Sequence, residues 1–373
     1  MSFEAVIGLE IHAQLLTATK IFCSCPTAFG APPNAHTCPV CVGLPGALPV
    51  LNRHAVDLAV TAAVALGCEV HERSVFARKN YFYPDLPKGY QISQYEQPLA
   101  TGGGVALPAA LGGRFVRLTR IHMEEDAGKS LHEGFADSER KTYLDYNRSG
   151  VPLIEIVSEP DMRSAEEARQ YLMKLRRILR YLGISSGDME EGAFRCDANV
   201  SVRPEGSTTF GTKVEVKNMN SFRAVFRAIQ FEEQRQRAML ESGQRISQET
   251  RGWVETRGET VSQRSKEAAH DYRYFPEPDI PSLEVNPEWV AQVRETLPEL
   301  PDAKRKRFGE QFGLSDYEAG VLTDTRAMAE FFEATVTLPM ANGTAPTDVW
   351  ARAKTVSNWC TGELLRLLNA HNL

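Results

Sequence analysis

Strand-like segments in which apolar and polar residues alternate constrain this fold more than any other feature of the chain. Over residues 194–203 the even positions are apolar, whereas the odd positions include Arg195 and Asp197. Residues 7–15 and 212–217 alternate in the same way. Successive side chains of a strand point to opposite faces, so these segments predict a sheet with one apolar and one charged face. An antiparallel sheet that is wetted on one side is the simplest interpretation.

Helical patterns separate these strands, and the last part of the chain contains helical patterns alone. Ser164 and Glu167 form a capping box before a leucine stripe, which predicts a helix over residues 165–182. Strand-like and helix-like segments alternate up to about residue 290, and only helical periods remain after that point. We therefore predict an α+β fold, with an antiparallel-sheet domain over residues 1–297 and an all-α helical domain over residues 298–373.

The connections between the strands differ in character. Residues 204–211 contain proline and glycine, so the strands on either side predict an antiparallel hairpin. Short strands over residues 142–146 and 153–157 are expected on either side of a turn at 147–150. Residues 76–99 are polar and aromatic without a clear period, and we predict an irregular segment there.

The charge balance and hydropathy of the chain disfavour several classes of protein. Lysine and arginine (42) are outnumbered by aspartate and glutamate (48), which gives a formal net charge of −6. Binding of nucleic acid through overall charge is therefore disfavoured, and any such contact must use a local patch. No apolar run has the roughly 18 residues of a spanning helix. The N-terminus also lacks the features of a signal peptide. We therefore predict a cytoplasmic protein without membrane contact.

Candidate metal ligands lie on the charged strand faces. Glu10 and His12 are two residues apart in one strand, roughly 6.6–6.8 Å along it, so both could reach one ion. Glu155 lies inside the apolar run 153–157, where an unpaired carboxylate would be costly and a cation would compensate it. Carboxylates with one imidazole suit a hard or borderline divalent ion such as Mg²⁺, which keeps positions for phosphate oxygens.

Further acidic and basic side chains extend this hypothesis to a metal–nucleotide site on the sheet face. The acids could serve more than one ion: Glu10, Glu124, Glu125, Glu155, Asp197 and Glu215. The bases could neutralise the phosphates of a nucleotide: Lys79, Lys213, Lys217 and Arg195. The chain has no Walker A sequence, no strand followed by Gly-x-Gly-x-x-Gly and no His-Glu-x-x-His motif. Phosphoryl transfer through metal ions and positioning is the chemistry that these residues favour.

Four of the seven cysteines have the spacing of a metal site. Cys23-x-Cys25 and Cys38-x-x-Cys41 are separated by twelve residues. This spacing predicts a closed tetrahedral thiolate site for zinc, which is structural rather than catalytic and staples the intervening loop. Reduced cysteines buried in a core are the alternative interpretation.

Seven segments, taken in order, resemble the B-subunit family of the tRNA-dependent amidotransferases (GatB). The first two are Ile-Gly-Leu-Glu-Ile-His-Ala-Gln-Leu at 7–15 and Lys-Asn-Tyr-Phe-Tyr-Pro-Asp at 79–85. Met-Glu-Glu-Asp-Ala-Gly-Lys follows at 123–129. The others occupy residues 145–155, 194–201, 215–221 and 271–279. The resemblance covers essentially the whole chain.

The resemblance implies a cradle-shaped α+β domain related to glutamine synthetase, followed by a helical domain. It implies a ligase that forms carbon–nitrogen bonds with glutamine as amido donor. ATP and Mg²⁺ would serve to phosphorylate the side-chain carboxylate of Glu on tRNA(Gln) or Asp on tRNA(Asn). Ammonia channelled from a glutaminase partner would then displace the phosphate. The implied partners are an amidase A subunit, a small C subunit and the mischarged tRNA, in a heterotrimer that serves translation.

The resemblance also suggests roles for individual residues. The family's magnesium ligands fall on Glu10, His12, Glu125 and Glu155, with Glu124 as a further candidate, and its zinc ligands fall on Cys23, Cys25, Cys38 and Cys41. Lys79 is our candidate for screening the two anions that must meet when a carboxylate is phosphorylated. With Lys79, the predicted catalytic residues are Glu124, Asp197 and Glu215, and the predicted nucleotide-binding residues are Lys213, Lys217 and Arg195.

One departure and two alternatives accompany this interpretation. Family members normally continue into a tail domain that grips the tRNA, and we expect this domain to be absent because the sequence stops at Leu373. A non-catalytic alternative is a zinc-stapled scaffold that docks tRNA to a partner and binds neither nucleotide nor magnesium. A free-standing ligase that uses glutamate and ammonia is the third hypothesis, and it would be active without tRNA or partners.

Overall fold

The computed structural model describes residues 2–132, 134–135, 137–265, 272–339 and 349–371. The chain divides into two compact units. The first comprises Met1–Arg176 and Ile184–Thr296, and the second comprises Arg177–Gly183 and Leu297–Leu373.

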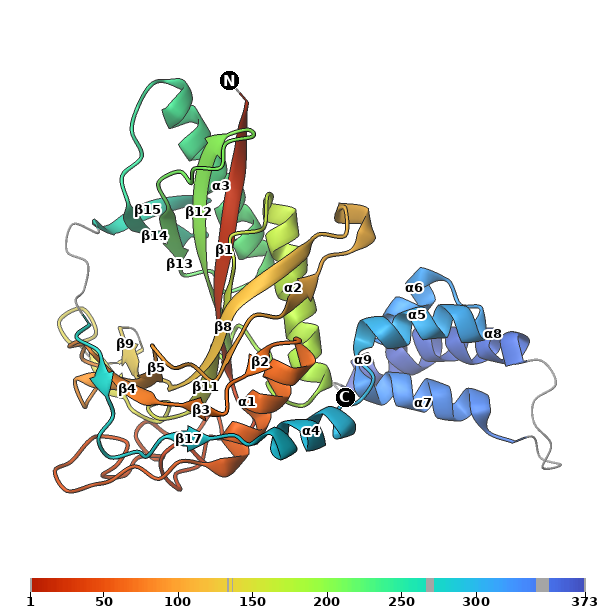
Figure 1. Ribbon diagram of the computed structural model, residues 1–373, viewed down its shortest axis with the longest axis horizontal. Helices are drawn as coiled ribbons and strands as arrows, with labels where there is room; N and C mark the ends of the chain where they lie inside the picture. Colours follow the sequence, from red (N-terminus) through yellow and green to blue (C-terminus); the bar gives the residue numbers. More distant parts are fainter. Residues whose placement is uncertain (1, 133, 136, 266–271, 340–348, 372–373) are drawn as a thin grey trace. The chain divides into compact units, whose positions relative to one another are not determined.

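A ten-stranded sheet of the described residues forms the centre of the first unit (Figure 1). Its long central strands are hydrogen-bonded in the order β12 (Phe194–Pro204), β1 (Phe3–Gln14), β11 (Pro152–Ser158) and β8 (Phe115–Glu125). Beyond β12 follow β13 (Val214–Lys217), β14 (Glu249–Val254) and β15 (Glu259–Ser265). Beyond β8 follow β6 (Ala100–Thr101) and β2 (Glu69–Val70), and β7 (Gly104–Ala106) also pairs with β8.

The strands of this sheet are mainly antiparallel. The β13–β14 pair is parallel, whereas the pairs among β12, β1, β11 and β8 are antiparallel. The predicted hairpin between β12 and β13 is confirmed by their antiparallel register. A mixed fold with a large, mainly antiparallel sheet is therefore confirmed.

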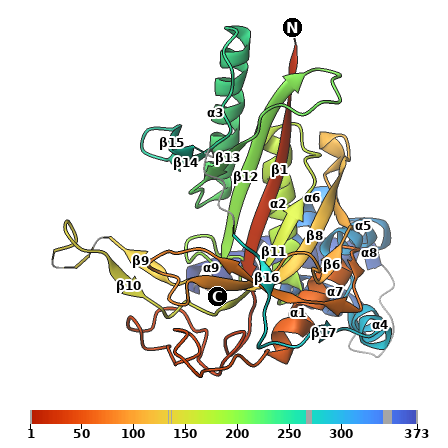
Figure 2. The same ribbon diagram turned by 60° about the vertical axis from the view of Figure 1, so that its left-hand side comes forward.

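The apolar face of the sheet holds the core of the first unit. Ile7, Leu9 and Ile11 of β1 are fully buried. Helices α2 (Ala165–Tyr181) and α3 (Phe222–Glu241) lie along the central strands in both views (Figures 1 and 2). Gln236 of α3 donates a hydrogen bond to the carbonyl oxygen of Val200 in β12. With its apolar side chains covered, the sheet can carry charged residues on its opposite face.

Polar side chains cap the first turns of two helices in this unit. The side-chain oxygen of Asn52 accepts hydrogen bonds from the first turn of α1 (Arg53–Ala65), as the cap rule requires. The Ser164 hydroxyl accepts a hydrogen bond from the backbone N–H of Glu167 at 3.1 Å and so caps α2. The carboxylate of Glu167 accepts its bond from the backbone N–H of Arg163 at 2.9 Å, so the second half of the predicted capping box involves Arg163 in place of Ser164. The remaining helices of this unit are η1 (Ala109–Leu111) and α4 (Pro287–Thr296) among the described residues.

Small sheets complete the first unit. They pair β4 (Phe76–Asn80) with β5 (Tyr90–Gln94) and β16 (Phe275–Pro276), β9 (Lys129–Leu131) with β10 (Tyr143–Asp145), and β3 (Arg73–Ser74) with β17 (Leu283–Glu284).

The prediction of an irregular segment over residues 76–99 is wrong, because β4 and β5 form an antiparallel pair there. The reason is that β5 buries polar side chains. Gln91 donates a hydrogen bond to the carbonyl oxygen of Glu125, and Ser93 donates one to the carboxylate of Glu124. A strand that buries glutamine and serine shows no hydrophobic period in the sequence.

Helices make up the second unit in the residues that the structure describes. They are α5 (Pro301–Phe312), α6 (Asp316–Leu322), α7 (Arg326–Thr337), α8 (Val349–Trp359), a π-helical turn (Cys360–Leu364) and α9 (Leu365–His371). The rings of Phe308, Phe312 and Phe332 pack in the core of this unit with centroids 5.0–5.5 Å apart. Within the described ranges of either unit, no helix combines the length and apolar composition needed to cross a membrane.

Truncation of Phe332 tests the importance of this aromatic core. Phe332 is fully buried, whereas the adjacent Phe331 is 52% exposed. We expect Phe332→Ala to cost about 3–5 kcal/mol of unfolding free energy through lost contacts and a cavity, and Phe331→Ala to cost much less. Urea unfolding followed by tryptophan fluorescence measures both variants. Equal losses would contradict the packing described for α5 and α7.

Candidate active site

A row of ionisable side chains crosses four strands at the centre of the sheet. In the strand register His122 of β8 lies opposite Glu155 of β11, Glu155 lies opposite His12 of β1, and His12 lies opposite Arg195 of β12. Directly opposed residues share a face, with their Cβ atoms about 4.5–5.5 Å apart. Strand pairing thus brings four residues that are distant in sequence into one patch on the polar face.

Two residues of this patch, together with Glu124 of β8, could hold a metal ion. The Nε2 atom of His12 lies 3.6 Å from a carboxylate oxygen of Glu124 and 3.4 Å from one of Glu155. One ligand atom from each of the three residues lies within 4.8 Å of the other two. Glu124 and Glu155 are buried, so their charges require compensation. Two carboxylates and one imidazole form a donor set that fits a divalent cation.

His122 is a neighbour of this group that the sequence analysis missed. Its Nε2 atom lies 3.3 Å from Glu155 and 3.7 Å from Glu124. Burial would lower the pKa of His122, but the carboxylates of Glu155 and Glu124 raise it to about 9. Burial would likewise raise the pKa of each carboxyl, but the two imidazoles lower both. A signal for His122 was available, because it lies two residues before Glu124 on the same face of β8.

Glu10 lies next to the group on β1. Its side chain accepts a hydrogen bond of 2.8 Å from the amide of Asn199. Burial raises the pKa of Glu10, and the carboxylate of Glu155 raises it further. Glu10 lies two residues before His12 on the same face of β1, but the group of ligand atoms that lie within 4.8 Å of one another contains His12, Glu124 and Glu155 and not Glu10.

The side chain of Glu125 points away from the face that carries the other predicted magnesium ligands. It follows Glu124 in the same strand, so the pleat directs its side chain to the other face. There its carboxylate forms an ion pair with Lys88 and accepts a hydrogen bond of 2.9 Å from the backbone N–H of Ile92. The structure does not bring Glu125 into the group of His12, Glu124 and Glu155, and its role as a ligand stays a prediction.

Lys79 is half-buried near the end of β4. Its ammonium lies 5.0 Å from the ring centre of Tyr272 and 6.0 Å from that of Tyr81. Burial would lower the pKa of Lys79, but the negative charges of Glu124 and Glu155 raise it above its ordinary value. The side chain therefore remains a cation, held by carboxylates and aromatic faces.

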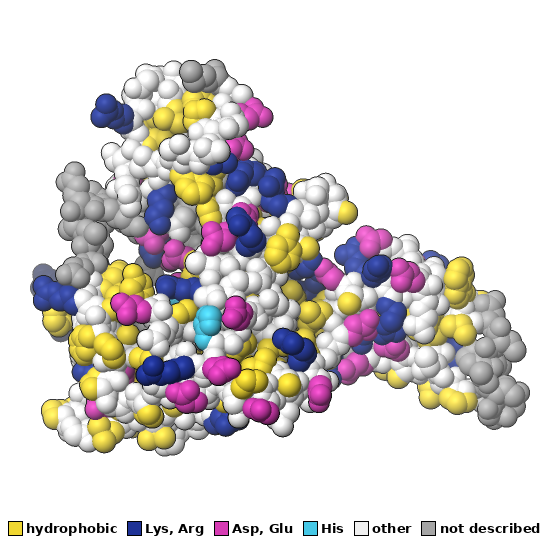
Figure 3. All heavy atoms as spheres, in the orientation of Figure 1, with side chains coloured by type: hydrophobic (Ala, Val, Ile, Leu, Met, Phe, Trp, Pro, Cys, Tyr) yellow, Lys and Arg dark blue, Asp and Glu magenta, His cyan; other side chains and the backbone are white. Residues whose placement is uncertain are grey.

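The predicted nucleotide-binding bases do not share one arrangement. Lys217 contacts Asp197 at 2.6 Å and Glu215 at 3.3 Å, so these residues form one charged group on β12 and β13. Lys213 is exposed and precedes β13. On the face of the molecule in Figure 3, basic and acidic side chains are interspersed. Recognition of an anion must therefore use local groups rather than a surface of one sign.

Asp126 is a second residue that the sequence analysis missed. Arg195 donates two hydrogen bonds to it at 2.9 and 3.0 Å, and Gln14 donates a third at 2.8 Å. Burial would raise the pKa of Asp126, but Arg195 and Arg148 lower it to about 2. Its partners come from β1, from β12 and from the turn after β10, and local patterning carries no signal for such pairing.

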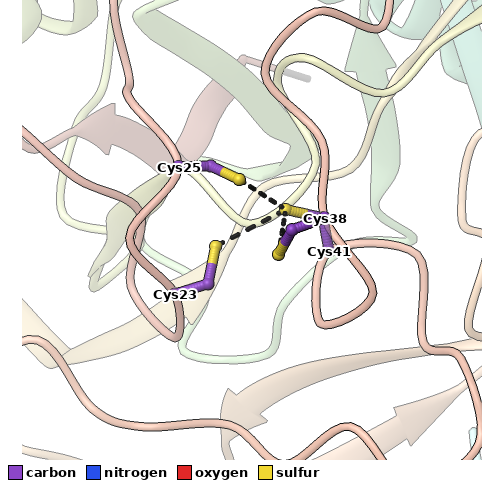
Figure 4. A group of neighbouring side chains, drawn as sticks. All are labelled: Cys23, Cys25, Cys38 and Cys41. Carbon is purple, nitrogen blue, oxygen red and sulfur yellow. Dashed lines mark hydrogen bonds between the residues drawn. The ribbon is translucent and has the colours of Figure 1, made fainter.

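The four predicted zinc ligands converge on Cys41 (Figure 4). The Sγ atoms of Cys23, Cys38 and Cys25 lie 3.5, 3.6 and 3.7 Å from the Sγ atom of Cys41. A tetrahedral site with Zn–S bonds of about 2.3 Å has sulfur–sulfur edges of about 3.8 Å, so the thiols fit zinc. The hydrogen bond from Cys23 and the ammonium of Lys20 lower the pKa of Cys41 to about 4, which favours the ligating thiolate.

The cysteine-bearing loop, residues 23–41, is hydrogen-bonded to the turn that follows β10. The backbone N–H of His36 donates a hydrogen bond of 2.8 Å to the side chain of Asn147. The Ser149 hydroxyl donates one of 3.2 Å to the carbonyl oxygen of Cys41. Lys20 is fully buried, and its ammonium donates a hydrogen bond of 2.7 Å to the carbonyl oxygen of His36. The loop and the turn therefore hold each other in position.

Comparison with known proteins identifies relatives of the whole chain. Residues 5–291 match the family model of the GatB/GatE catalytic domain. The chain is 57% identical over 368 residues to the B subunit of the aspartyl/glutamyl-tRNA(Asn/Gln) amidotransferase of Carboxydothermus hydrogenoformans, which covers 99% of this chain and 74% of that protein. It is 56% identical over 375 residues to the protein of the same name from Moorella thermoacetica, covering 100% of this chain and 76% of that protein.

Removal of the Asp126 charge tests the ion pairs beside the sheet centre. We expect Asp126→Asn to cost about 3 kcal/mol at neutral pH, because it leaves the partly exposed Arg195 without its carboxylate. The pKa of the folded carboxyl, about 2, lies below its ordinary value of 3.8. Its stabilisation is therefore present above about pH 4 and is lost as the pH falls towards 2. The pair of Asp161 with the exposed Arg117 provides a control, and Asp161→Asn should cost clearly less than Asp126→Asn. Denaturant midpoints at several pH values measure these effects, and no difference between the two variants would refute the assignment.

Zinc content tests the thiolate site. We expect about one zinc ion per purified chain, and Cys41→Ser to lose most of it because Cys41 contacts each of the other three thiols. Cys360→Ala, in the helical unit, is the matched control and should retain the metal. Elemental analysis by mass spectrometry measures the content, and full retention of zinc by Cys41→Ser would contradict the prediction.

Proposed function

Because the chain belongs to the GatB/GatE catalytic domain family, we propose that it is the carboxylate-activating subunit of a tRNA-dependent amidotransferase. In this role it is a ligase that forms carbon–nitrogen bonds with glutamine as amido donor. Relatives more than 50% identical over nearly the full chain carry the name of this subunit and support the assignment. The observation that carries the chemical proposal is the buried group of His12, Glu124 and Glu155.

The proposed reaction has two steps. First, the side-chain carboxylate of Glu on tRNA(Gln), or of Asp on tRNA(Asn), attacks the γ-phosphorus of ATP. The bond from that phosphorus to the bridging oxygen breaks, and ADP leaves. Ammonia then attacks the acyl carbon, the carbon–oxygen bond to phosphate breaks, and the amide forms with loss of a proton. A glutaminase partner supplies the ammonia through a channel.

The first step requires two anions, the carboxylate and the phosphate, to approach each other. Residues of the polar face would provide the positive charge that reduces their repulsion. His12, Glu124 and Glu155 would hold Mg²⁺, and Glu10 would contribute from the same face of β1, two residues before His12. When bound, the ion supplies positive charge that screens phosphate oxygens and polarises the reacting phosphorus. Because the ligands come from three paired strands, their positions are set by the sheet before substrate binds.

Cations of the chain itself would orient the two substrates. Lys79 keeps its proton beside Glu124 and can neutralise charge on the transferred phosphoryl group. Arg195 belongs to β12 and Lys217 belongs to β13. Both side chains would contact the nucleotide phosphates. Asp197 and Glu215 hold Lys217 in place, and Lys213 would contribute from the exposed end of the strand.

The proposal includes partners and a structural metal. The chain would act in the cytoplasm in a heterotrimer with an amidase A subunit and a small C subunit, and its substrate would be a mischarged tRNA. Zinc on the four cysteines would fix the loop that is bonded to the turn after β10. A non-catalytic docking scaffold would have no need to bury two carboxylates beside two histidines on the sheet face, so the structure favours the catalytic proposal.

Substitution of Glu155 provides the main test. Glu155→Gln keeps the shape of the side chain but removes a charge opposite His12, and we expect a loss of at least about 100-fold in amide formation and in tRNA-dependent ATP hydrolysis. Glu159→Gln is the control, because Glu159 accepts a hydrogen bond from Thr119 at an exposed position. Both variants are assayed with charged tRNA and the partner subunits, and circular dichroism checks their fold. Full turnover by Glu155→Gln would overturn the proposed role of the group.

A further inference from the structure

Lys20 is a charged side chain without contact to solvent. Its exposed fraction is 0%, and it is one of the largest fully buried side chains among the described residues. Lysine is almost never buried to this extent unless its charge is paired, because a buried ammonium without an anion is costly. The proposed reaction gives this charge no role, and its neighbours must therefore explain why it is tolerated.

The ammonium of Lys20 donates three hydrogen bonds, one for each of its protons. Two go to the backbone carbonyl oxygens of His36 and Tyr146, at 2.7 and 3.4 Å. The third goes to the Sγ atom of Cys41 at 3.4 Å. A carbonyl oxygen carries no net charge, so Cys41 is the one acceptor of the three that can become an anion.

Glu125 is an acidic side chain in the same region, but its charge has another partner. A Cβ atom on Gly150 would lie 3.5 Å from the Cδ atom of Lys20 and 3.9 Å from a carboxylate oxygen of Glu125. That carboxylate forms its ion pair with Lys88 and accepts a hydrogen bond from the backbone N–H of Ile92. Lys88 therefore neutralises Glu125, and the charge of Lys20 still requires an anion.

The thiol cluster supplies that anion once it holds a metal. Four thiolates around one Zn²⁺ carry a net charge of about −2, because four negative charges meet two positive ones. Cys41 is buried and the other three cysteines are partly buried, so this charge lies largely away from water. At a separation of 3.4 Å the ammonium compensates part of it, and the attraction is stronger there than it would be in water. The metal-loaded site and Lys20 therefore each provide the charge that the other requires.

The backbone fixes Lys20 between the first cysteine pair and the turn after β10. Its own N–H donates a hydrogen bond of 3.0 Å to the carbonyl oxygen of Cys25. The N–H of the next residue, Ile21, donates one of 2.9 Å to the carbonyl oxygen of Gly150 in the turn. Because its ammonium also bonds to the second cysteine pair and to the start of the turn, one residue joins three segments.

This turn also reaches the charged side chains beside the sheet centre. It contains Arg148, whose guanidinium donates hydrogen bonds of 2.9 and 2.6 Å to the carbonyl oxygens of Ala127 and Gly128. The same guanidinium lies 3.6 Å from Asp126, the carboxylate that Arg195 also binds. The turn thus connects the thiolate site to the ion pairs next to the sheet centre.

We propose that Lys20 is a positioning residue of the thiolate site, and that its ammonium supplies the counter-charge for metal-bound Cys41 while it ties the cysteine-bearing loop to the turn. This inference rests on the structural zinc that is part of the proposed function. It goes beyond that zinc, because it makes metal binding and the closure of the loop on the turn depend on one charge. Loss of the metal leaves the ammonium without an anion, and loss of the ammonium leaves the bound metal with uncompensated negative charge.

Removal of the ammonium tests the counter-charge. Lys20→Met keeps most of the apolar side chain but removes the charge, and Lys20→Gln also removes the charge while it can still donate hydrogen bonds to carbonyl oxygens. We expect each substitution to raise the dissociation constant of zinc at least about tenfold, as is typical for partners of metal ligands. Competition with a chromophoric chelator measures the affinity of the full chain. Lys304→Met is the matched control, since Lys304 is a buried lysine of the helical unit beside Glu333, and this variant should bind zinc as the unmodified chain does.

A spectrum distinguishes the counter-charge from a purely mechanical role of the lysine. Co²⁺ replaces zinc in a four-thiolate site and gives charge-transfer bands that arise from donation of sulfur electrons to the metal. A thiolate that loses the nearby ammonium donates more readily, so we expect these bands to move to longer wavelength in both Lys20 variants and to stay in place in Lys304→Met. Circular dichroism checks the fold, and Lys20→Gln carries the test should Lys20→Met fail to fold.

The outcomes separate this inference from the proposed function. Unchanged zinc affinity in the Lys20 variants would overturn the inference. Weaker zinc binding with unmoved cobalt bands would also overturn it, because the lysine would then act only through its hydrogen bonds to the two carbonyl oxygens. Both results would leave the zinc site of the proposed function standing. An unmodified chain that binds no zinc would overturn the structural metal and this inference together, whereas the activity of Glu155→Gln would still decide the reaction.

Discussion

Compensation of buried charge on the polar sheet face governs the architecture of the first unit. Glu124 and Glu155 are buried, and each would cost several kcal/mol there without a partner. His12 of β1 and His122 of β8 supply that compensation. The arrangement depends on strand register, since a shift of one residue would turn these side chains to the apolar face. The long, uninterrupted pairing of β1 with β12 and β11 fixes that register.

The same constraint explains why function concentrates on one face. Helices cover the apolar side, so charged residues can gather only on the other. Their spacing along and across the strands creates distinct groups, with the histidine–carboxylate group at the centre and the pairs of Asp126 and Lys217 beside it. A rigid sheet holds such groups more accurately than loops do, which suits phosphoryl transfer by positioning.

The sequence predicts those features of the structure that depend on the alternation and spacing of residues close together in the chain. Polar and apolar faces, the Ser164 cap and the cysteine quartet depend on residues that are close together in the sequence, and the structure contains these faces, this cap and the thiol cluster. Pairing across the sheet is not local. Nothing in the sequence around Asp126 indicates that Arg195 binds it, and Glu124 and Glu125 could be assigned to opposite faces only once the bounds of β8 were known. The hairpin of β4 and β5 was missed because its buried side chains are polar.

The cysteine-bearing loop is bonded to a turn more than a hundred residues later in the chain. His36 and Asn147 are 111 positions apart, and Cys41 and Ser149 are 108 apart. During synthesis the loop emerges long before Asn147 and Ser149, so these two hydrogen bonds can form only after the turn that follows β10 has been made. Until then its thiols are accessible to solvent and to any available metal. Early metal capture would shorten the search for that late contact, because four residues would already be gathered around one ion.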